Sequence, residues 1–425
     1  MLDIKIIREN PDTVRQAIAR RRMDPQRVDV DKLIALDEKW RELQGQAEAM
    51  RAERNAASQS IKKLTGDERN TAIATVKALK DKLASAEAAA EGIKGERDQL
   101  LADMPNLLAA DVPDGGDDES NVEISRWGEP RRFDFPARDH VEIGELTDTI
   151  DFDGGAKVAG SNFYFLKREA ALLEQALCIF AARELLPAGY QVMSTPDLAR
   201  DQILSGIGFQ PRGPETQVYS VENSDLSLIG TAEIALGGYH ADTIIDGSKL
   251  PLRYLGFSHC FRTEAGAYGK ESRGLYRVHQ FTKAEMFIYC STEQSAEMHE
   301  EIRAHEERLL QKLELPYRVV NVCAGDLGAP AYKKYDIEAW MPGRNAYGEV
   351  TSCSNCTDYQ ARRLNIRYRP DAKAAPRPLH MLNGTAIAVS RTLIAILENY
   401  QQADGSVRIP DVLQPLVGAQ TIPLR

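Results

Sequence analysis

Two runs of heptad-spaced residues near the N-terminus constrain the fold more strongly than any other feature of the sequence. Over residues 33–64, and again over residues 72–104, mostly apolar residues recur at alternating spacings of three and four, which is typical of the seam between paired helices. The segment Thr65-Gly66-Asp67 separates the two runs. The chain is therefore predicted to form an antiparallel coiled-coil hairpin over residues 31–104, with helices about 50 Å long.

The hairpin is basic towards its turn, although the whole chain of 425 residues has a formal net charge of -10. The basic residues nearest the turn are Lys62, Lys63, Arg69, Lys77, Lys80 and Lys82. Alone, such an arm is explained equally well as a spacer, as a dimerising coiled coil or as a binding element. The small alanine side chains in the second run favour close pairing within one chain.

The sequence divides into an N-terminal part, a linker and a larger C-terminal part. Short helices and the hairpin occupy residues 1–110. Residues 111–130 are rich in acidic residues, proline and glycine, which is typical of a linker. Residues 131–425 mix helix and strand patterns, and their length suits an α+β domain with a large core.

The composition also bears on the compartment and on metals. No apolar run approaches the roughly 20 residues that a membrane-spanning helix needs, and the first residues carry charges where a signal peptide is apolar. The six cysteines are scattered along the chain, as expected for reduced thiols, so we expect a cytoplasmic protein. Cys353 and Cys356 have the spacing of zinc ligands, but no second pair completes a four-ligand site, so no zinc is expected.

Two predicted strands in the C-terminal part carry charged residues on one face. In the first, alternation places Arg262 and Glu264 on the same side. The corresponding face of the second strand holds Arg277, His279, Phe281, Lys283 and Glu285. Buried charges need partners, so this face suits the floor of a polar ligand site better than a core.

The chemistry of this face favours a nucleotide and an amine. Guanidinium groups bind phosphates, and Lys270 and Arg273 in the connecting loop add further positive charge. Phe281 offers a flat apolar surface for a base, and Glu285 suits an ammonium group. The loop segment 266–272 is not a P-loop, because its glycine spacing is short and glutamate follows its lysine.

The run Phe261-Arg262-Thr263-Glu264, followed by a loop and Arg277-Val278-His279-Gln280-Phe281, resembles motif 2 of the class II aminoacyl-tRNA synthetases. Its flanking residues are similar to those of the seryl-tRNA synthetases in particular. In that family the first arginine holds the α-phosphate and the amino-acid carboxylate, the loop arginine reaches the γ-phosphate, and the phenylalanine stacks on adenine. The resemblance implies an ATP site that includes Arg262, Thr263, Glu264, Arg273, Val278 and Phe281.

Two more segments extend the resemblance. The run Thr231-Ala232-Glu233 resembles the part of the family that lines the serine pocket, and the residues after it depart from the usual Val-Pro-Leu. Asn383-Gly384-Thr385 and the following helix resemble motif 3, whose Arg391 would hold the γ-phosphate near a helix N-terminus. The implied serine-binding residues are Thr231, Ala232, Glu233, Arg262, Glu285, Asn383 and Thr385.

The segment Glu349-Val350-Thr351-Ser352 offers the hard oxygen ligands that Mg²⁺ prefers beside phosphates. In the family, Glu349 and Ser352 would hold the metal that accompanies ATP, and the whole segment would contact the nucleotide. Residues three apart on a regular strand point to opposite faces. The metal assignment therefore requires a β-bulge or a strand end between them.

The resemblance implies a class II fold, an antiparallel sheet flanked by helices, with motif 1 near residues 167–186 forming a homodimer interface. It implies that serine and ATP form seryl-adenylate, with Arg262, Arg391 and Glu349 as the catalytic residues. The serine then passes to tRNA(Ser), which the hairpin grips; tRNA(Sec) is a further candidate acceptor. Two alternatives stay open: a ligase that loads a carrier protein, and an inactive tRNA-binding relative.

Overall fold

The protein is described by a computed structural model that covers residues 1–209, 217–264 and 273–425. The chain separates into two compact units, Met1–Leu107 and Leu108–Arg425. The loop segment 266–272, with Lys270, lies outside the described residues.

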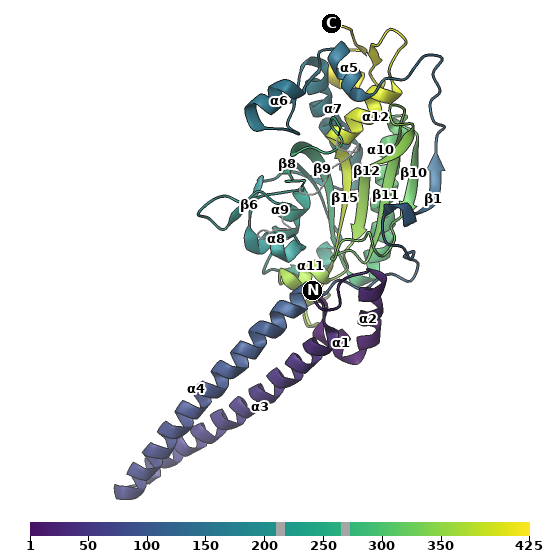
Figure 1. The fold of residues 1–425 in the computed structure, drawn as a ribbon. Coiled ribbons are helices and arrows are strands. Elements are labelled where there is room, and N and C mark those ends of the chain that lie inside the picture. The colour runs from purple at the N-terminus through teal and green to yellow at the C-terminus, as the bar shows by residue number, and fades with distance from the viewer. Residues whose placement is uncertain (210–216, 265–272) are drawn as a thin grey trace. The chain divides into compact units, whose positions relative to one another are not determined.

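The first unit confirms the predicted helical hairpin. Two short helices, α1 (Ile4–Glu9) and α2 (Pro11–Arg20), precede the long helices α3 (Val30–Ser60) and α4 (Gly66–Asp103). A single 3-10 turn, Ile61–Lys63, follows α3 at the tip (Figure 1). The observed break between the long helices therefore falls where the heptad pattern is interrupted.

The seam of the hairpin is buried most deeply away from the tip. Ala47 on α3, and Leu83 and Ala90 on α4, are buried along the hairpin, whereas Leu33 is buried in a cluster with residues of α1, α2 and the end of α4. Near the base, the fully buried carboxylate of Asp37 accepts hydrogen bonds from Arg8 at 2.6 and 2.8 Å. This ion pair ties α1 to α3, because a buried charge is stable only when it is paired.

The second unit is organised around a large sheet. Within the described residues it has eight strands, and all neighbouring pairs are antiparallel except β4 and β8. In spatial order the strands are β1 (Val122–Trp127), β10 (Tyr317–Asn321), β11 (Lys333–Met341), β12 (Ala346–Asn355), β15 (His380–Ala388), β9 (Gln280–Cys290), β8 (Leu252–Phe261) and β4 (Gln191–Ser194).

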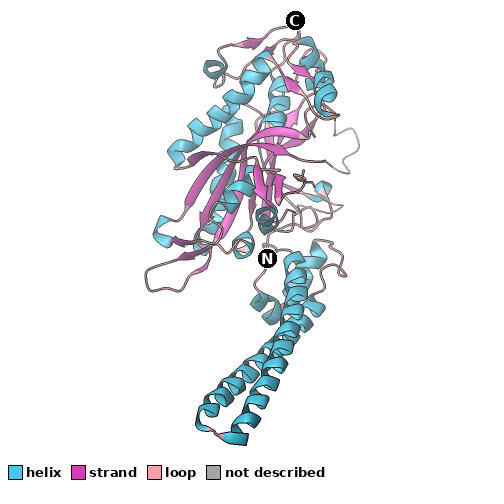
Figure 2. Cartoon of the chain, turned by 90° about the vertical axis from the view of Figure 1, so that its left-hand side faces the viewer, coloured by secondary structure: helices cyan, strands magenta, loops and turns pink. Residues whose placement is uncertain are grey.

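Helices cover both faces of this sheet (Figure 2). The helices that pack in the larger core are α7 (Arg168–Leu185), α10 (Ser295–Lys312) and α12 (Val389–Asn399). The opposite core is covered by α8 (Asp201–Ile207), α9 (Ala232–Gly238) and α11 (Tyr359–Arg363). Strand β9 serves both cores by alternation: Met286 and Ile288 enter the larger one, and Phe287 and Tyr289 the other.

The remaining elements are short. The helices are α5 (His140–Leu146), α6 (Phe152–Ala159) and α13 (Gln414–Val417). The minor sheets pair β2 (Ile150–Asp151) with β3 (Phe165–Leu166), β5 (Leu198–Arg200) with β6 (Leu226–Leu228), β16 (Val407–Arg408) with β17 (Thr421–Ile422), and β13 (Arg367–Arg369) with both β7 (Ile244–Asp246) and β14 (Arg377–Pro378).

Two sequence expectations differ from the structure. Residues 111–130, expected to be a linker, contain β1, which pairs with β10 at the edge of the sheet. The motif 2 strands are also shorter than predicted, because β8 ends at Phe261 and β9 begins at Gln280. At the end of β8, Glu264 has a φ of 48°, and the backbone N–H of Thr263 bonds to the carbonyl of the distant residue Gln217 instead of continuing the ladder.

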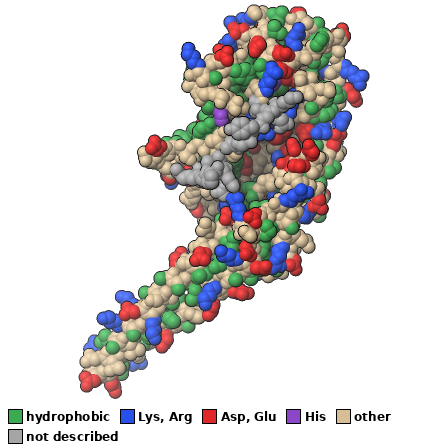
Figure 3. Space-filling view, in the orientation of Figure 1, with side chains coloured by type: hydrophobic (Ala, Val, Ile, Leu, Met, Phe, Trp, Pro, Cys, Tyr) green, Lys and Arg blue, Asp and Glu red, His purple; other side chains and the backbone are tan. Residues whose placement is uncertain are grey.

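The surface shows charged side chains of both signs, and the basic residues near the tip of the hairpin are exposed (Figure 3). Among the described residues, no helix combines the length and the apolar character needed to cross a bilayer.

A carboxyl group lies in the core beneath the sheet. Glu306 on α10 is fully buried. Its Oε1 lies close to Gly384 of β15, so that a Cβ at position 384 would be only 2.9 Å away from this oxygen. Burial raises the pKa of this carboxyl well above its usual value. The folded protein therefore keeps Glu306 protonated in a pH range where the unfolded chain releases the proton.

This difference predicts a pH-dependent stability. Above the unfolded pKa of about 4.3 the folded state binds more protons, so the free energy of unfolding should fall as pH rises. Glu306→Gln imitates the neutral acid and should gain stability relative to the wild type between pH 5 and pH 8, measured by denaturant unfolding. Glu297→Gln, at an exposed position of α10, is the control. Parallel pH profiles for wild type and Glu306→Gln would contradict the assignment.

Candidate active site

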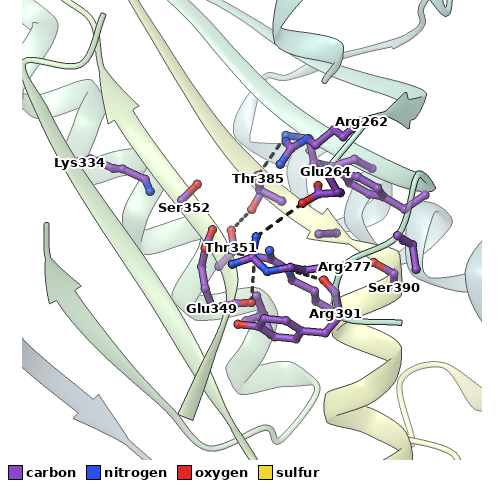
Figure 4. Close-up of a pocket in the computed structure, with 16 residues that line it drawn as sticks. Arg262, Glu264, Arg277, Lys334, Glu349, Thr351, Ser352, Thr385, Ser390 and Arg391 are labelled. Carbon is purple, nitrogen blue, oxygen red and sulfur yellow. Dashed lines mark hydrogen bonds and ion pairs between the residues drawn. The ribbon is translucent and has the colours of Figure 1, made fainter. Parts of the chain in front are cut away.

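A cavity of about 340 Å³ opens on the sheet where motif 2, β12, β15 and the start of α12 meet (Figure 4). Most of its lining is polar or charged. The lining residues are Arg262, Glu264, Tyr276, Arg277, Val278, Phe281, Lys283, Lys334, Glu349, Val350, Thr351, Ser352, Thr385, Ala388, Ser390 and Arg391. Four separate stretches of the chain therefore build one site.

The fold brings together most of the residues predicted for ATP and the metal. Those that line the cavity are Arg262, Glu264, Val278, Phe281, Glu349, Val350, Thr351, Ser352 and Arg391. Two others do not line it. The backbone of Thr263 bonds to Gln217, and Nη1 of Arg273 forms an ion pair of 3.2 Å with Oδ2 of Asp139. The side chain of Arg273 is 63% exposed.

A β-bulge shapes the cavity wall. In the pairing of β11 with β12, Ile337 lies opposite Thr351 and the next residue, Glu338, lies opposite Glu349, so Val350 is an extra residue. The bulge changes the direction of the side chains, and Glu349 and Ser352 both line the cavity. The irregularity that the metal assignment requires is therefore present.

The cavity lies where two strands stop pairing. The ladder between β12 and β15 ends at Cys353 and Gly384. Beyond it, the hydroxyl of Thr351 donates to the carbonyl of Thr385, so one side chain replaces the backbone ladder. A second register shift follows Thr385 in the pairing of β15 with β9. The two irregular strands leave room for a ligand between them.

Arg391 and Glu349 form an ion pair in the lining of the cavity (Figure 4). Nη1 of Arg391 lies 3.1 Å from Oε2 of Glu349, and its guanidinium carbon is 4.7 Å from the ring centroid of Tyr276. Burial by itself would raise the pKa of Glu349, but the positive charges of Arg391 and Lys334 lower it to about 2. Glu349 is thus a permanent negative charge at physiological pH.

Arg262 reaches the opposite side of the cavity. Its guanidinium carbon lies 5.3 Å from the ring centroid of Phe281, and its Nε donates to the carbonyl of Gly230 at 3.2 Å. Arg277 and Glu264 form a looser pair, with 3.6 Å between Nη1 and Oε2. An arginine stacked on an aromatic ring keeps hydrogen-bond donors available for a ligand.

A buried cluster of carboxylates adjoins the cavity. Glu285 Oε2 lies 2.5 Å from Lys283 Nζ and accepts a hydrogen bond of 3.3 Å from the hydroxyl of Thr385. Both Lys283 and Thr385 line the cavity, so the cluster meets the ligand space there. Asn383 donates to Glu233 Oε1 at 2.9 Å.

Glu233 lies in the same cluster, at its hydrogen bond with Asn383. Burial, together with the charge of Glu285, raises the pKa of Glu233 to about 7. Gln360 donates to the same Oε1 at 2.8 Å. Thr231 caps α9 by accepting a hydrogen bond from the backbone N–H of Glu233, whereas Ala232 is fully buried. The predicted serine-site residues thus fall into one connected region, in which Ala232 provides packing.

The cavity also contains residues that the motifs did not single out. Lys283 belongs to the charged strand face that the sequence predicts, but the family motifs give it no role. Lys334 lies on β11, outside the three motifs, with its Nζ 2.9 Å from Oδ1 of Asp336. Tyr276 gives the cavity a ring on which Arg391 and Arg344 both stack. Lys334 reaches the site only through the pairing of β11 with the adjacent strand β12, so the three motifs contain no signal for it.

The donor set fits a metal that accompanies a nucleotide. Within the described residues, no group of three or more histidine, cysteine or carboxylate side chains is arranged to hold a metal on its own. Glu349 and Ser352 offer two hard oxygen atoms beside the cavity. Mg²⁺ is typically held by one or two protein oxygens plus phosphates and water. Cys353 and Cys356 are buried, and Cys356 accepts a hydrogen bond of 3.8 Å from Asn383.

An antiparallel sheet with one arginine directly after strand β8 and another in the first turn of α12 is typical of the catalytic domain of a class II aminoacyl-tRNA synthetase. The family model of the tRNA synthetase class II core domain (G, H, P, S and T) matches residues 217–400, and that of the seryl-tRNA synthetase N-terminal domain matches residues 1–108.

Individual relatives narrow the class. The chain is 57% identical to the serine–tRNA ligase of Dictyoglomus turgidum over 99% of both chains. Seryl-tRNA synthetase from Pyrococcus horikoshii, solved in complex with ATP, is 42% identical over both whole chains with a TM-score of 0.94. The enzyme from Naegleria fowleri, in complex with AMP, is 34% identical with a TM-score of 0.88, covering 100% of this chain and 99% of its own. The chain belongs to the seryl-tRNA synthetase family, and its activity is the ligation of serine to tRNA.

The site geometry predicts that two arginines are needed for adenylation. Arg262→Ala and Arg391→Ala each remove a charge from the cavity, an effect worth about 3 kcal/mol or more where charge develops in a transition state. Serine-dependent ATP–pyrophosphate exchange should therefore fall at least about 100-fold in kcat/KM. Arg408→Ala, at an exposed position, is the control and should not change the rate. Near-normal exchange in either cavity variant would remove that arginine from the mechanism.

Proposed function

We propose that the cavity binds ATP and serine side by side and joins them as seryl-adenylate, before the serine passes to tRNA(Ser). One observation carries this proposal: a cavity lined by arginines and a permanent carboxylate adjoins a buried cluster that suits an amino acid. Arg262 lies beside Phe281, and both groups line the same space.

For ATP, we assign adenine to the ring of Phe281 and the α-phosphate to Arg262. Arg391, opposite, would bind the γ-phosphate. The relative from Pyrococcus horikoshii, solved with ATP, supports a nucleotide in this fold. Arg273 is paired with Asp139, so its proposed contact with the γ-phosphate requires that this ion pair open.

Glu349 and Ser352 would hold Mg²⁺ with the nucleotide. The metal supplies positive charge against the phosphates and lowers the repulsion that an attacking carboxylate meets. The low pKa of Glu349 favours this role because the carboxylate stays ionised. Lys334, 2.9 Å from Asp336, adds a further cation to the same wall.

For serine, we assign the ammonium group to Glu285 and the hydroxyl to the polar groups around Thr385, Asn383 and Glu233. The serine carboxylate would attack the α-phosphorus, forming an O–P bond while the bond to pyrophosphate breaks. No side chain needs to act as a nucleophile. The protein contributes by holding the reactants in line and by stabilising charge.

The remaining proposals concern assembly. We assign residues 1–110 to tRNA(Ser) binding through the exposed basic residues near the hairpin tip, and residues 131–425 to catalysis. Residues 111–130 connect the two and add β1 to the edge of the large sheet. A second candidate acceptor is tRNA(Sec). Leu172 and Ile179 on α7, and Leu186 after it, are 45–54% exposed at seven-residue spacing, which favours a homodimer through this face. Sedimentation equilibrium that gives a monomer mass would contradict the dimer.

The free cysteines fit a reducing cytoplasm, which cell fractionation tests.

Amino-acid selection tests the proposed function. A site built to hydrogen-bond a hydroxyl rejects an analogue without it by about 10⁴ to 10⁵. ATP–pyrophosphate exchange should therefore depend on serine and be nearly absent with alanine, when all twenty amino acids are compared. Comparable rates with alanine and serine would contradict the assignment of the polar cluster.

The arm is tested by replacing residues 31–104 with a short Gly/Ser link. All residues assigned to ATP and serine lie at or beyond Thr231, so serine-dependent exchange should persist within a few fold. Charging of tRNA should collapse and lose much of its salt dependence, which amounts to roughly 0.7 to 0.9 log units per phosphate contact per decade of salt. Efficient charging without the arm would make it a spacer. Loss of exchange as well would show that the two functions are not separable.

A further inference from the structure

A buried histidine, His140, joins three segments that surround the cavity. It is the first residue of α5 and is 5% exposed. Its Nδ1 lies 2.9 Å from Oε1 of Glu398 on α12, and its Nε2 accepts a hydrogen bond of 3.1 Å from the backbone N–H of Leu275. Glu398 Oε2 in turn accepts from the backbone N–H of Gly343, in the turn between β11 and β12, at 2.9 Å.

The partners define the tautomer of this histidine. A backbone N–H can only donate, so Nε2 of His140 must be unprotonated to accept from Leu275. The ring proton then resides on Nδ1 and is donated to Glu398. The backbone N–H of His140 also donates to Oε1 of Glu398, at 3.1 Å. The carboxylate thus receives three donors, and each of the His140 ring nitrogens has its own partner.

Two glycines allow the chain to pass close to this pair. Gly274 has a φ of 69°, and a Cβ there would lie 2.1 Å from Nε2 of His140. A Cβ on Gly343 would lie 3.0 Å from Cδ of Glu398. Any larger residue at either position would push the backbone away from the His140–Glu398 pair.

The segment held by His140 carries part of the proposed ATP site. Leu275 lies between Arg273 and Tyr276. The carbonyl of Tyr276 accepts from Nε of Arg391 at 3.4 Å, and Arg391 stacks on its ring. Glu398 follows Arg391 by seven residues on α12, close to two helical turns, so both project from one side of the helix.

We propose that His140 is a positioning residue for adenylation: through its bonds to Leu275 and Glu398 it sets residues 273–276 against Arg391, where the ATP phosphates bind. This role rests on the proposed ATP site. It requires no contact between His140 and the substrate. Its loss would misplace groups that bind ATP and leave the polar cluster assigned to serine in place.

Two substitutions separate the bonds of His140. In His140→Gln the side-chain carbonyl can occupy the place of Nε2 and accept from Leu275. In His140→Asn the side-chain amide can occupy the place of Nδ1 and donate to Glu398, but the N–H of Leu275 loses its partner. His140→Asn should raise the KM for ATP about tenfold, the effect of one lost hydrogen bond, with the KM for serine unchanged within about twofold. His140→Gln should stay within about threefold of the wild type for both.

Exchange kinetics at varied ATP and varied serine measure this difference, with thermal unfolding as the check of folding. His259→Asn is the matched control, because His259 also pairs with a carboxylate, Asp197 at 2.8 Å, but is exposed. If His140 only supports the fold, both His140 variants should lose stability without a selective rise of the KM for ATP over the KM for serine. Equal ATP KM values in His140→Asn and His140→Gln would overturn the proposal.

The variant Arg391→Ala distinguishes a failure of the His140 proposal from a failure of the proposed function. If Arg391→Ala retains exchange, the ATP site itself is misassigned. If Arg391→Ala abolishes exchange while both His140 variants match the wild type, only the role of His140 fails. Nitrogen-15 NMR of the imidazoles gives a second measurement on the unaltered protein, with the His140 signals assigned by their absence in His140→Gln. A neutral ring protonated on Nδ1 is expected, and a proton on Nε2 would overturn the proposal.

Discussion

The ion pair between Arg391 and Glu349 is the interaction on which the rest of the site depends. It places opposite charges 3.1 Å apart in the lining of a cavity in which most lining groups are polar. Arg391 and Lys334 keep Glu349 ionised, since burial alone would raise the pKa of this carboxyl. The pair can open towards phosphates and a metal, because both partners line the ligand space. The two charges therefore stabilise each other in the empty site, and both are available to bind ATP and its metal when the nucleotide is present.

The charged residues of the site lie where the backbone pairing of the sheet is interrupted. The bulge at Val350 and the end of the ladder between β12 and β15 open the sheet beside Glu349 and Thr385. On β9, the face that carries Phe281, Lys283 and Glu285 continues directly into apolar residues of the second core. A rigid sheet thus supplies precise positions, and the irregular strands supply the space. Such preorganisation is what a reaction without a protein nucleophile needs.

The sequence allowed some of these features to be predicted because they are local. The heptad spacing and its interruption located both long helices, and the alternation on β9 separated the site face from the core face. The need for a bulge or a strand end beside Glu349 followed from strand geometry together with the metal ligands that the family resemblance implies. Other features arise only from tertiary contacts. Lys334 reaches the cavity through the pairing of β11 with β12, and His140 reaches Leu275 across a long stretch of chain. The early end of β8 depends on the left-handed residue Glu264 and on the bond from Thr263 to Gln217, which no spacing rule reveals.

The central claim is that one cavity holds ATP and serine in the stated orientation. A crystal structure of the protein with a non-hydrolysable analogue of seryl-adenylate tests it most directly. The account predicts adenine stacked on Phe281, the phosphate mimic within hydrogen-bond distance of Arg262, and the serine ammonium at Glu285. An analogue that binds outside this cavity, or one whose amino group points away from Glu285, would contradict it.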